Sequence, residues 1–212
     1  MGTRKLAFYG VAVLLAGCVP VVSLHPLFTK ESIVFEEKLL GTWVQDANRP
    51  QVTWEFARLE AEAAERVTPE MHDQVQKCYR LSMRDDKGRT GSFAACLVKL
   101  QNHLFLDVVP DRFPSDEVDA EQMKLAYNAY FFVPVHTFVK VDVIGEQLQL
   151  RLTDDEEFKK LVETEPNAVR YDTLDDRPVL TAPTAEIQAF VTKYAGNERL
   201  FPNKLTLTRP RP

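Results

Sequence analysis

Apolar and polar residues alternate on both sides of a glycine in residues 136–153, and this pattern constrains the fold more than any other feature. The stretch reads HTFVKVDVIGEQLQLRLT. We take Gly145 and Glu146 as a two-residue turn, in which glycine supplies the positive φ of a type II′ turn. That register places three aliphatic pairs on one face: Val143 with Leu148, Val141 with Leu150, and Val139 with Leu152. The other face is polar, which is typical of an antiparallel sheet with one buried side.

A second hairpin is predicted in residues 77–98, KCYRLSMRDDKGRTGSFAACLV, centred on Lys87. Gly88 suits the left-handed position of a three-residue loop. A third strand, HLFLDVV at 103–109, turns back through residues 101 and 102, so the three strands form a meander.

Four more segments alternate with a period of two, giving about nine strands in all. They are residues 41–45, 51–57, 169–173 and 204–209.

Three helices are predicted in the second half of the chain. One covers residues 119–131, one starts at an Asp154 cap, and one is opened by Pro183 and ended by Gly196. Many antiparallel strands with few crossovers predict a mainly β fold of the α+β class, an antiparallel barrel of about 8–9 strands with two or three peripheral helices.

The first strand opens with Gly41, Thr42 and Trp43 after the short apolar segment IVFEEKLL. This opening resembles the Gly-x-Trp start of the lipocalin and calycin barrels. The resemblance implies a lipocalin-like barrel in which Arg209, in the last strand, packs on the Trp43 ring.

Residues 14–18 read LLAGC, after Arg4, Lys5 and the apolar stretch 6–15. These are the parts of a secretory signal, and the apolar stretch is too short for a stable helix across a bilayer of roughly 30 Å. Because the small residues lead into Cys18, the stretch resembles the lipobox of bacterial lipoproteins. A membrane helix, or a cleaved signal with a chance cysteine, is the alternative.

The lipobox resemblance implies three divisions of the chain: a cleaved leader at 1–17, a lipidated tether at 18–34 and a single barrel-like domain at 35–212. Cys18 would carry the lipid, and two or three acyl chains make anchoring effectively permanent. Val19, in the sorting pattern of that family, implies the outer membrane facing the periplasm. The mature chain also resembles a group of bacterial lipoproteins that share HPLF, LLGTW and HLFLD stretches.

Charge limits the classes of partner. The full chain carries a formal net charge of −5 and has no cluster of Lys and Arg, which argues against nucleic acid as a partner. We therefore expect membrane attachment to come from the lipid on Cys18.

Cys78 and Cys96 are symmetric about Lys87, so an unbulged hairpin places them opposite each other at a non-hydrogen-bonded pair, about 4.5 Å apart at Cα. That spacing allows a disulfide, and an exported compartment favours one. Two buried thiols, or a bulge that separates the residues, remain the alternatives.

No residue pattern favours catalysis, a cofactor or a metal site. The four histidines lie far apart in the sequence, and no nucleophile, phosphate-loop or dinucleotide motif occurs. The histidines are His25, His72, His103 and His136.

Two non-catalytic functions follow as hypotheses. In the first, the barrel holds an apolar small molecule or lipid. In the second, the domain has a solid core and serves as a structural or interaction partner of another envelope protein.

Overall fold

The computed structural model describes residues 20–45, 51–59, 75–110 and 133–211. Cys18 with the leader, the predicted helix at 119–131 and His72 lie outside these residues. No helix within the described ranges has the length and apolar character needed to span a membrane.

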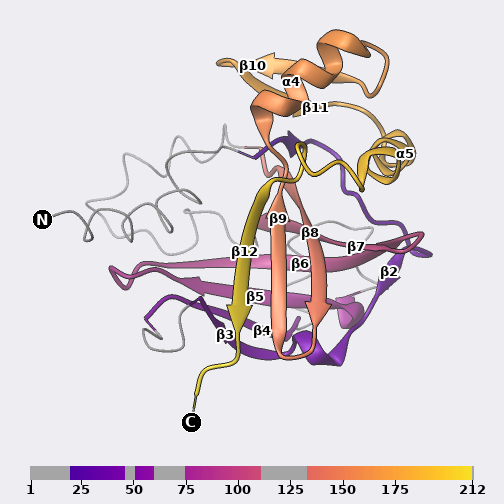
Figure 1. Ribbon diagram of the computed structural model, residues 1–212. Coiled ribbons are helices and arrows are strands. Elements are labelled where there is room, and N and C mark those ends of the chain that lie inside the picture. The colour runs from indigo at the N-terminus through magenta and orange to yellow at the C-terminus, as the bar shows by residue number, and fades with distance from the viewer. Residues whose placement is uncertain (1–19, 46–50, 60–74, 111–132, 212) are drawn as a thin grey trace, which may run out of the picture.

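The chain folds into a closed antiparallel barrel of eight strands, as predicted. Each barrel strand pairs with the next along the chain, and the last strand pairs with the first, as in a lipocalin-like up-and-down barrel (Figure 1). The strands are β3 (Gly41–Val44), β4 (Thr53–Arg58), β5 (Cys78–Arg84), β6 (Thr90–Leu100), β7 (His103–Pro110), β8 (His136–Ile144), β9 (Gln147–Leu152) and β12 (Asn203–Thr208).

Both predicted hairpins have the register that the sequence indicates. In β8–β9, Val141 lies opposite Leu150, and Gly145 has a φ of +58°. In β5–β6, Cys78 lies opposite Cys96, and Gly88 has a φ of +77°. Glycine at each turn and the alternation of apolar and polar residues beside it therefore agree with the observed pairing.

The inward face of every barrel strand contributes to one apolar core. Its bulkiest members fill the cross-section of the barrel rather than leaving a channel. The core consists of Leu39, Trp43, Trp54, Phe56, Tyr79, Leu81, Ala95, Leu97, Leu106, Val139, Val141, Leu148, Leu150 and Leu207.

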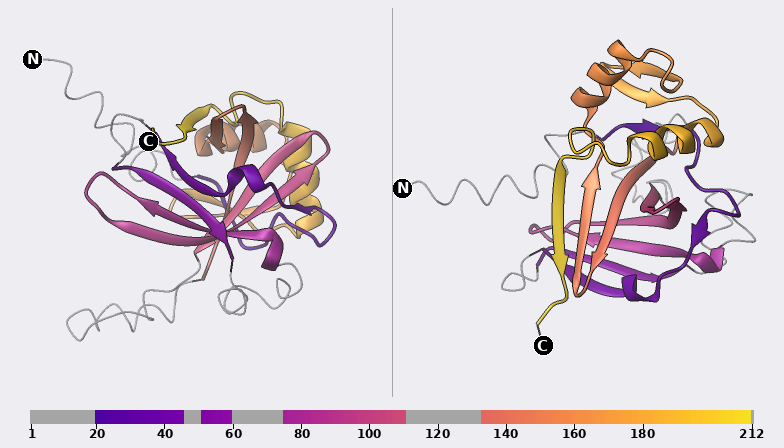
Figure 2. Two further views of the ribbon diagram at one scale, coloured as in Figure 1. Left: turned by 90° about the horizontal axis from the view of Figure 1, so that it is seen from below. Right: turned by 45° about the vertical axis from the view of Figure 1, so that its right-hand side comes forward.

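Between β9 and β12 the chain leaves the barrel and forms a second layer. This insertion consists of α4 (Asp155–Thr164), β10 (Tyr171–Leu174), β11 (Arg177–Leu180) and α5 (Thr184–Tyr194). Asp154 caps α4 as predicted, accepting a hydrogen bond from the Glu157 amide at 2.9 Å. Figure 2, right, shows the insertion lying beyond one end of the barrel strands.

The N-terminal segment joins this layer to the barrel. The short strand β1 (Val22–Ser23) pairs with β8 on one side and with β11 on the other. A second short strand, β2 (Ile33–Val34), pairs with β6. From β1 onward, the residues expected to form a tether at 18–34 are thus part of the folded body.

A second apolar core lies outside the barrel, between the outer face of β5–β8 and the insertion. It includes Phe105 and Phe138, which contact residues of the second layer and not the barrel interior. Neither ring fills the barrel interior. Alternation places both rings on the outer face, where the insertion and the N-terminal segment cover them.

Candidate functional site

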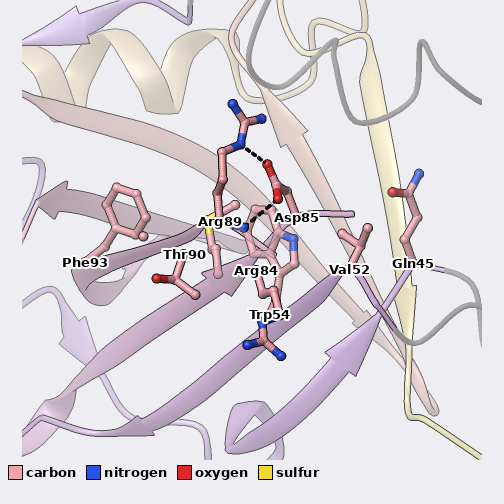
Figure 3. A pocket seen from close by; sticks show the side chains of 10 residues that line it. Gln45, Val52, Trp54, Arg84, Asp85, Arg89, Thr90 and Phe93 are labelled. Carbon is pink, nitrogen blue, oxygen red and sulfur yellow. Dashed lines mark hydrogen bonds and ion pairs between the residues drawn. The ribbon is translucent and has the colours of Figure 1, made fainter. Parts of the chain in front are cut away.

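A cavity of about 240 Å³ opens at one end of the barrel (Figure 3). Trp54 of β4, Met83 of β5 and Phe93 of β6 line it from the inward faces of their strands. Trp54 is buried, whereas Met83 and Phe93 are half-buried, so their apolar surfaces remain partly open to the cavity. The remaining lining residues are Gln45, Val52, Arg84, Asp85, Arg89, Thr90 and Gly91.

The rim of the cavity carries charged side chains, two of which, Asp85 and Arg89, form an ion pair. Asp85, at the tip of the β5–β6 hairpin, accepts hydrogen bonds from the backbone amides of Lys87 and Arg89 and from Arg89 Nε at 2.6 Å. Burial opposes ionisation of Asp85, but these donors outweigh it and hold the pKa of the carboxyl group below its usual range. Asp85 thus shapes the loop, and the exposed Arg84 and Arg89 side chains give the rim a positive character.

The opposite end of the barrel is closed by the segment before β3. Within it, η1 (Glu37–Leu39) follows Glu36, whose backbone N–H donates to the Tyr79 hydroxyl at 2.7 Å and whose carbonyl accepts from it at 3.1 Å. The Phe35 ring stacks on Tyr79 with centroids 5.0 Å apart. Burial raises the pKa of Tyr79 to about 12. Within the described part of the chain, a ligand can therefore enter the barrel at the Trp54 end.

Gly41, Trp43 and Arg209, singled out by the lipocalin resemblance, meet at the start of β3. The Arg209 guanidinium lies 3.8 Å from the Trp43 ring centroid, and the Trp43 indole N–H donates to the Leu39 carbonyl at 2.8 Å. Gly41 has a φ of +98°, and a Cβ there would lie 3.2 Å from Arg209 Nη1. The positive φ favours glycine at this position, and a Cβ would in addition crowd the Arg209 guanidinium.

Cys78 and Cys96 form a disulfide across the β5–β6 hairpin, with their Cα atoms 4.3 Å apart. Both side chains are buried in the second apolar core, outside the barrel. The bridge therefore joins strands beneath the N-terminal segment.

A buried acid–base pair on the outer face of the barrel could not be predicted from the sequence. Asp107 Oδ1 lies 2.6 Å from His136 Nδ1, and Asp107 Oδ2 accepts the Leu27 amide hydrogen at 2.6 Å. Both ionisable side chains are at least nine-tenths buried, and the Phe28 ring meets the His136 ring edge-on. The N-terminal segment covers the pair, so a substrate could not reach it. We interpret Asp107 and His136 as residues that hold the N-terminal segment against the barrel.

Two α5 side chains hold the same segment from the other side. Thr184 Oγ1 donates to the Pro26 carbonyl at 2.8 Å, and Gln188 Nε2 donates to the Leu27 carbonyl at 2.7 Å. The HPLF stretch, residues 25–28, is therefore the segment on which the barrel and the insertion converge.

Of the other residues considered from sequence, His25 lies in this segment and His103 begins β7, far from the cavity lining. The described residues contain no group of three or more His, Cys, Asp or Glu side chains arranged to hold a metal ion.

Comparison of the chain with protein-family models, with curated proteins and with solved structures found no match.

Proposed function

We propose that the protein is a lipid-anchored bacterial envelope protein whose barrel binds a small apolar molecule at its open end. The apolar cavity beside Trp54, Met83 and Phe93 is the observation that carries the binding role. Its role is non-catalytic, and its location is the outer membrane facing the periplasm.

The size of the cavity sets the size of the ligand. A cavity near 150 Å³ accommodates benzene, so about 240 Å³ suits a molecule of roughly ten non-hydrogen atoms. Below the cavity, Phe56 and Leu81 are fully buried and occupy the barrel axis. We therefore favour a compact ring or a short chain over a full-length acyl chain.

A fluorescent two-ring probe, 1-aminonaphthalene, tests this binding role. Val52→Arg places a charge in the cavity lining and should abolish the fluorescence enhancement of the probe. Ile144→Arg makes the same change at an exposed position on the β8–β9 turn and should leave the enhancement intact. Equal enhancement in all three proteins would contradict a binding site at this end.

The anchoring role rests on Cys18 and has its own test. Cys18→Ser should release the domain as a soluble exported protein, because no acyl chain is then attached. A Cys18→Ser protein that still fractionates with membranes after an alkaline wash would contradict the lipid anchor.

The packed lower barrel supports a second candidate function, an interaction protein of the envelope that holds no ligand. Its supporting observation is that Trp43, Phe56, Tyr79 and Leu148 are almost completely buried. This alternative would be favoured if no apolar probe bound in the cavity at the Trp54 end while Cys18 still carried its lipid.

A further inference from the structure

In the sheet formed by β1, β11 and β10, strands β1 and β11 have one buried face and one open face, whereas all four residues of β10 are exposed. Val22 pairs with Val179, and Val179 with Asp172, so these three residues share a face. Alternation adds Leu24 and Leu174 to the same face. We call Val22, Leu24, Val179 and Leu174 the apolar lip.

Exposure distinguishes the two faces of this sheet. Leu174 is 68 % exposed and Leu24 is 43 % exposed, whereas Ser23 and Leu180 on the opposite face are buried. Leu174 lies on β10 and Leu24 directly follows β1, the two strands that flank β11, with Val179 between them on the same face. Large apolar side chains spread across an open face indicate a surface that contacts something apolar.

The apolar lip continues the inner surface of the barrel. Directly paired residues run in one row from the interior outward: Ala95 of β6, Val108 of β7, Thr137 of β8, Val22 of β1 and Val179 of β11. Paired residues point to the same side of a sheet, so the lip faces the same side as the inward residues of β6 and β7. Phe93, which lines the cavity, is the next inward position of β6 after Ala95. The lip therefore extends from the open end of the barrel.

The proposed lipid would be attached very close to this lip. Cys18 precedes Val22 by four residues, which span at most about 14 Å. β1 is paired on both sides, and the Asp107 and Gln188 hydrogen bonds to Leu27 hold the segment that follows it. A domain fixed so near its anchor has little freedom to turn away from the bilayer.

Charge at the open end is compatible with phospholipid headgroups. The β5–β6 hairpin, residues 78–92, carries four cations and two anions in a chain whose overall formal charge is −5. Its exposed Arg84 and Arg89 lie at the cavity rim. On the lip face, Asp172 and Arg177 carry opposite charges beside the aliphatic side chains.

We propose that the apolar lip lies on the bilayer surface, so that the open end of the barrel faces the lipid. This orientation rests on the proposed attachment of lipid at Cys18, and it makes the membrane the source from which an apolar ligand enters the cavity.

Site-specific labelling of the lipidated full chain tests this orientation. A single cysteine carrying an environment-sensitive fluorophore is placed at Leu174→Cys in the lip, at Thr90→Cys on the cavity rim, or at Ile144→Cys on the β8–β9 turn. Cys78 and Cys96 are bridged, so they do not compete for the label. The proteins are reconstituted in phosphatidylethanolamine–phosphatidylglycerol vesicles that contain spin-labelled lipid as a quencher.

We expect the Leu174 label to be quenched severalfold more than the Ile144 label, with the Thr90 label also above Ile144. Equal quenching at Leu174 and Ile144, in a protein that carries lipid by intact mass and stays on the vesicles, would overturn the orientation alone. Shielding of Leu174 from both lipid and water-soluble quenchers would do the same, because another surface would then cover the lip. A wild-type chain that carries no lipid would overturn the anchor and this inference together.

Discussion

The Arg209 guanidinium lies over the Trp43 ring at 3.8 Å and also donates hydrogen bonds to the backbone carbonyls of Lys38, at 2.7 Å, and Thr42, at 3.2 Å. One side chain directly after the last barrel strand, β12, therefore holds both the first strand and the segment that closes the barrel end. This contact joins the two ends of the barrel sequence.

Arg209→Ala should lower the free energy of unfolding by about 1–3 kcal/mol, because it removes a cation–π contact and two hydrogen bonds. Urea denaturation measures the change. Arg211→Ala, at an exposed position two residues later, is the control and should shift stability by less than about 0.5 kcal/mol. Matching urea midpoints for the two variants would show that the Trp43 contact contributes nothing.

Asp107→Asn should lower the free energy of unfolding by about 1.5–3 kcal/mol, because it replaces the buried carboxylate that contacts His136 Nδ1 and accepts the Leu27 amide hydrogen. The same substitution at Asp142, which pairs with Arg151 at 2.9 Å on the surface, should cost less than about 1 kcal/mol. Hydrogen exchange should also quicken at the Leu27 amide in the Asp107 variant only. Similar losses of stability in the Asp107 and Asp142 variants would contradict the role of Asp107 in holding the N-terminal segment.

Loss of the Cys78–Cys96 bridge should destabilise the domain by about 3 kcal/mol, since the two residues are separated by 18 positions and the bridge restricts the unfolded chain. The urea midpoint of the wild type should fall on reduction, and the Cys78→Ala/Cys96→Ala variant should be insensitive to reductant. A wild-type midpoint unchanged by full reduction would contradict the prediction.

The free energy of unfolding should fall at alkaline pH because Tyr79 is buried. Its pKa rises from 10.0 to about 12 on folding, so folding favours the neutral phenol. The resulting stability is present below pH 10 and is lost as the pH rises toward 12, by about 3 kcal/mol for two pH units. Lysines titrate over the same range in any variant, so the readout is the difference between wild type and Tyr79→Phe. The variant should lose less stability over this interval; parallel losses would contradict a buried phenol.

The two hairpins could be predicted from sequence because each depends on local features. Gly88 and Gly145 mark the turns, and alternation on either side leaves one register that keeps the apolar residues on a single face. The Gly41, Trp43 and Arg209 cluster came instead from a resemblance to a barrel family, since no local pattern joins residues so far apart.

The contacts that hold the N-terminal segment against the barrel could not be predicted in the same way. β1 and β2 are two-residue strands, too short for any periodicity to show. Asp107 occupies one polar position in a strand, and nothing in its neighbourhood indicates a partner in His136 or in the Leu27 backbone. The cavity depends on how Trp54, Met83 and Phe93 pack together, which alternation alone does not determine.

The barrel is proposed to hold a small apolar molecule at its Trp54 end. The most direct measurement compares native and denaturing mass spectra of residues 19–212, exported as a soluble protein and purified without detergent. We expect additional mass in the native spectrum that is lost on denaturation and is missing from Val52→Arg. A bare wild-type chain, identical in mass under native and denaturing conditions, would contradict it.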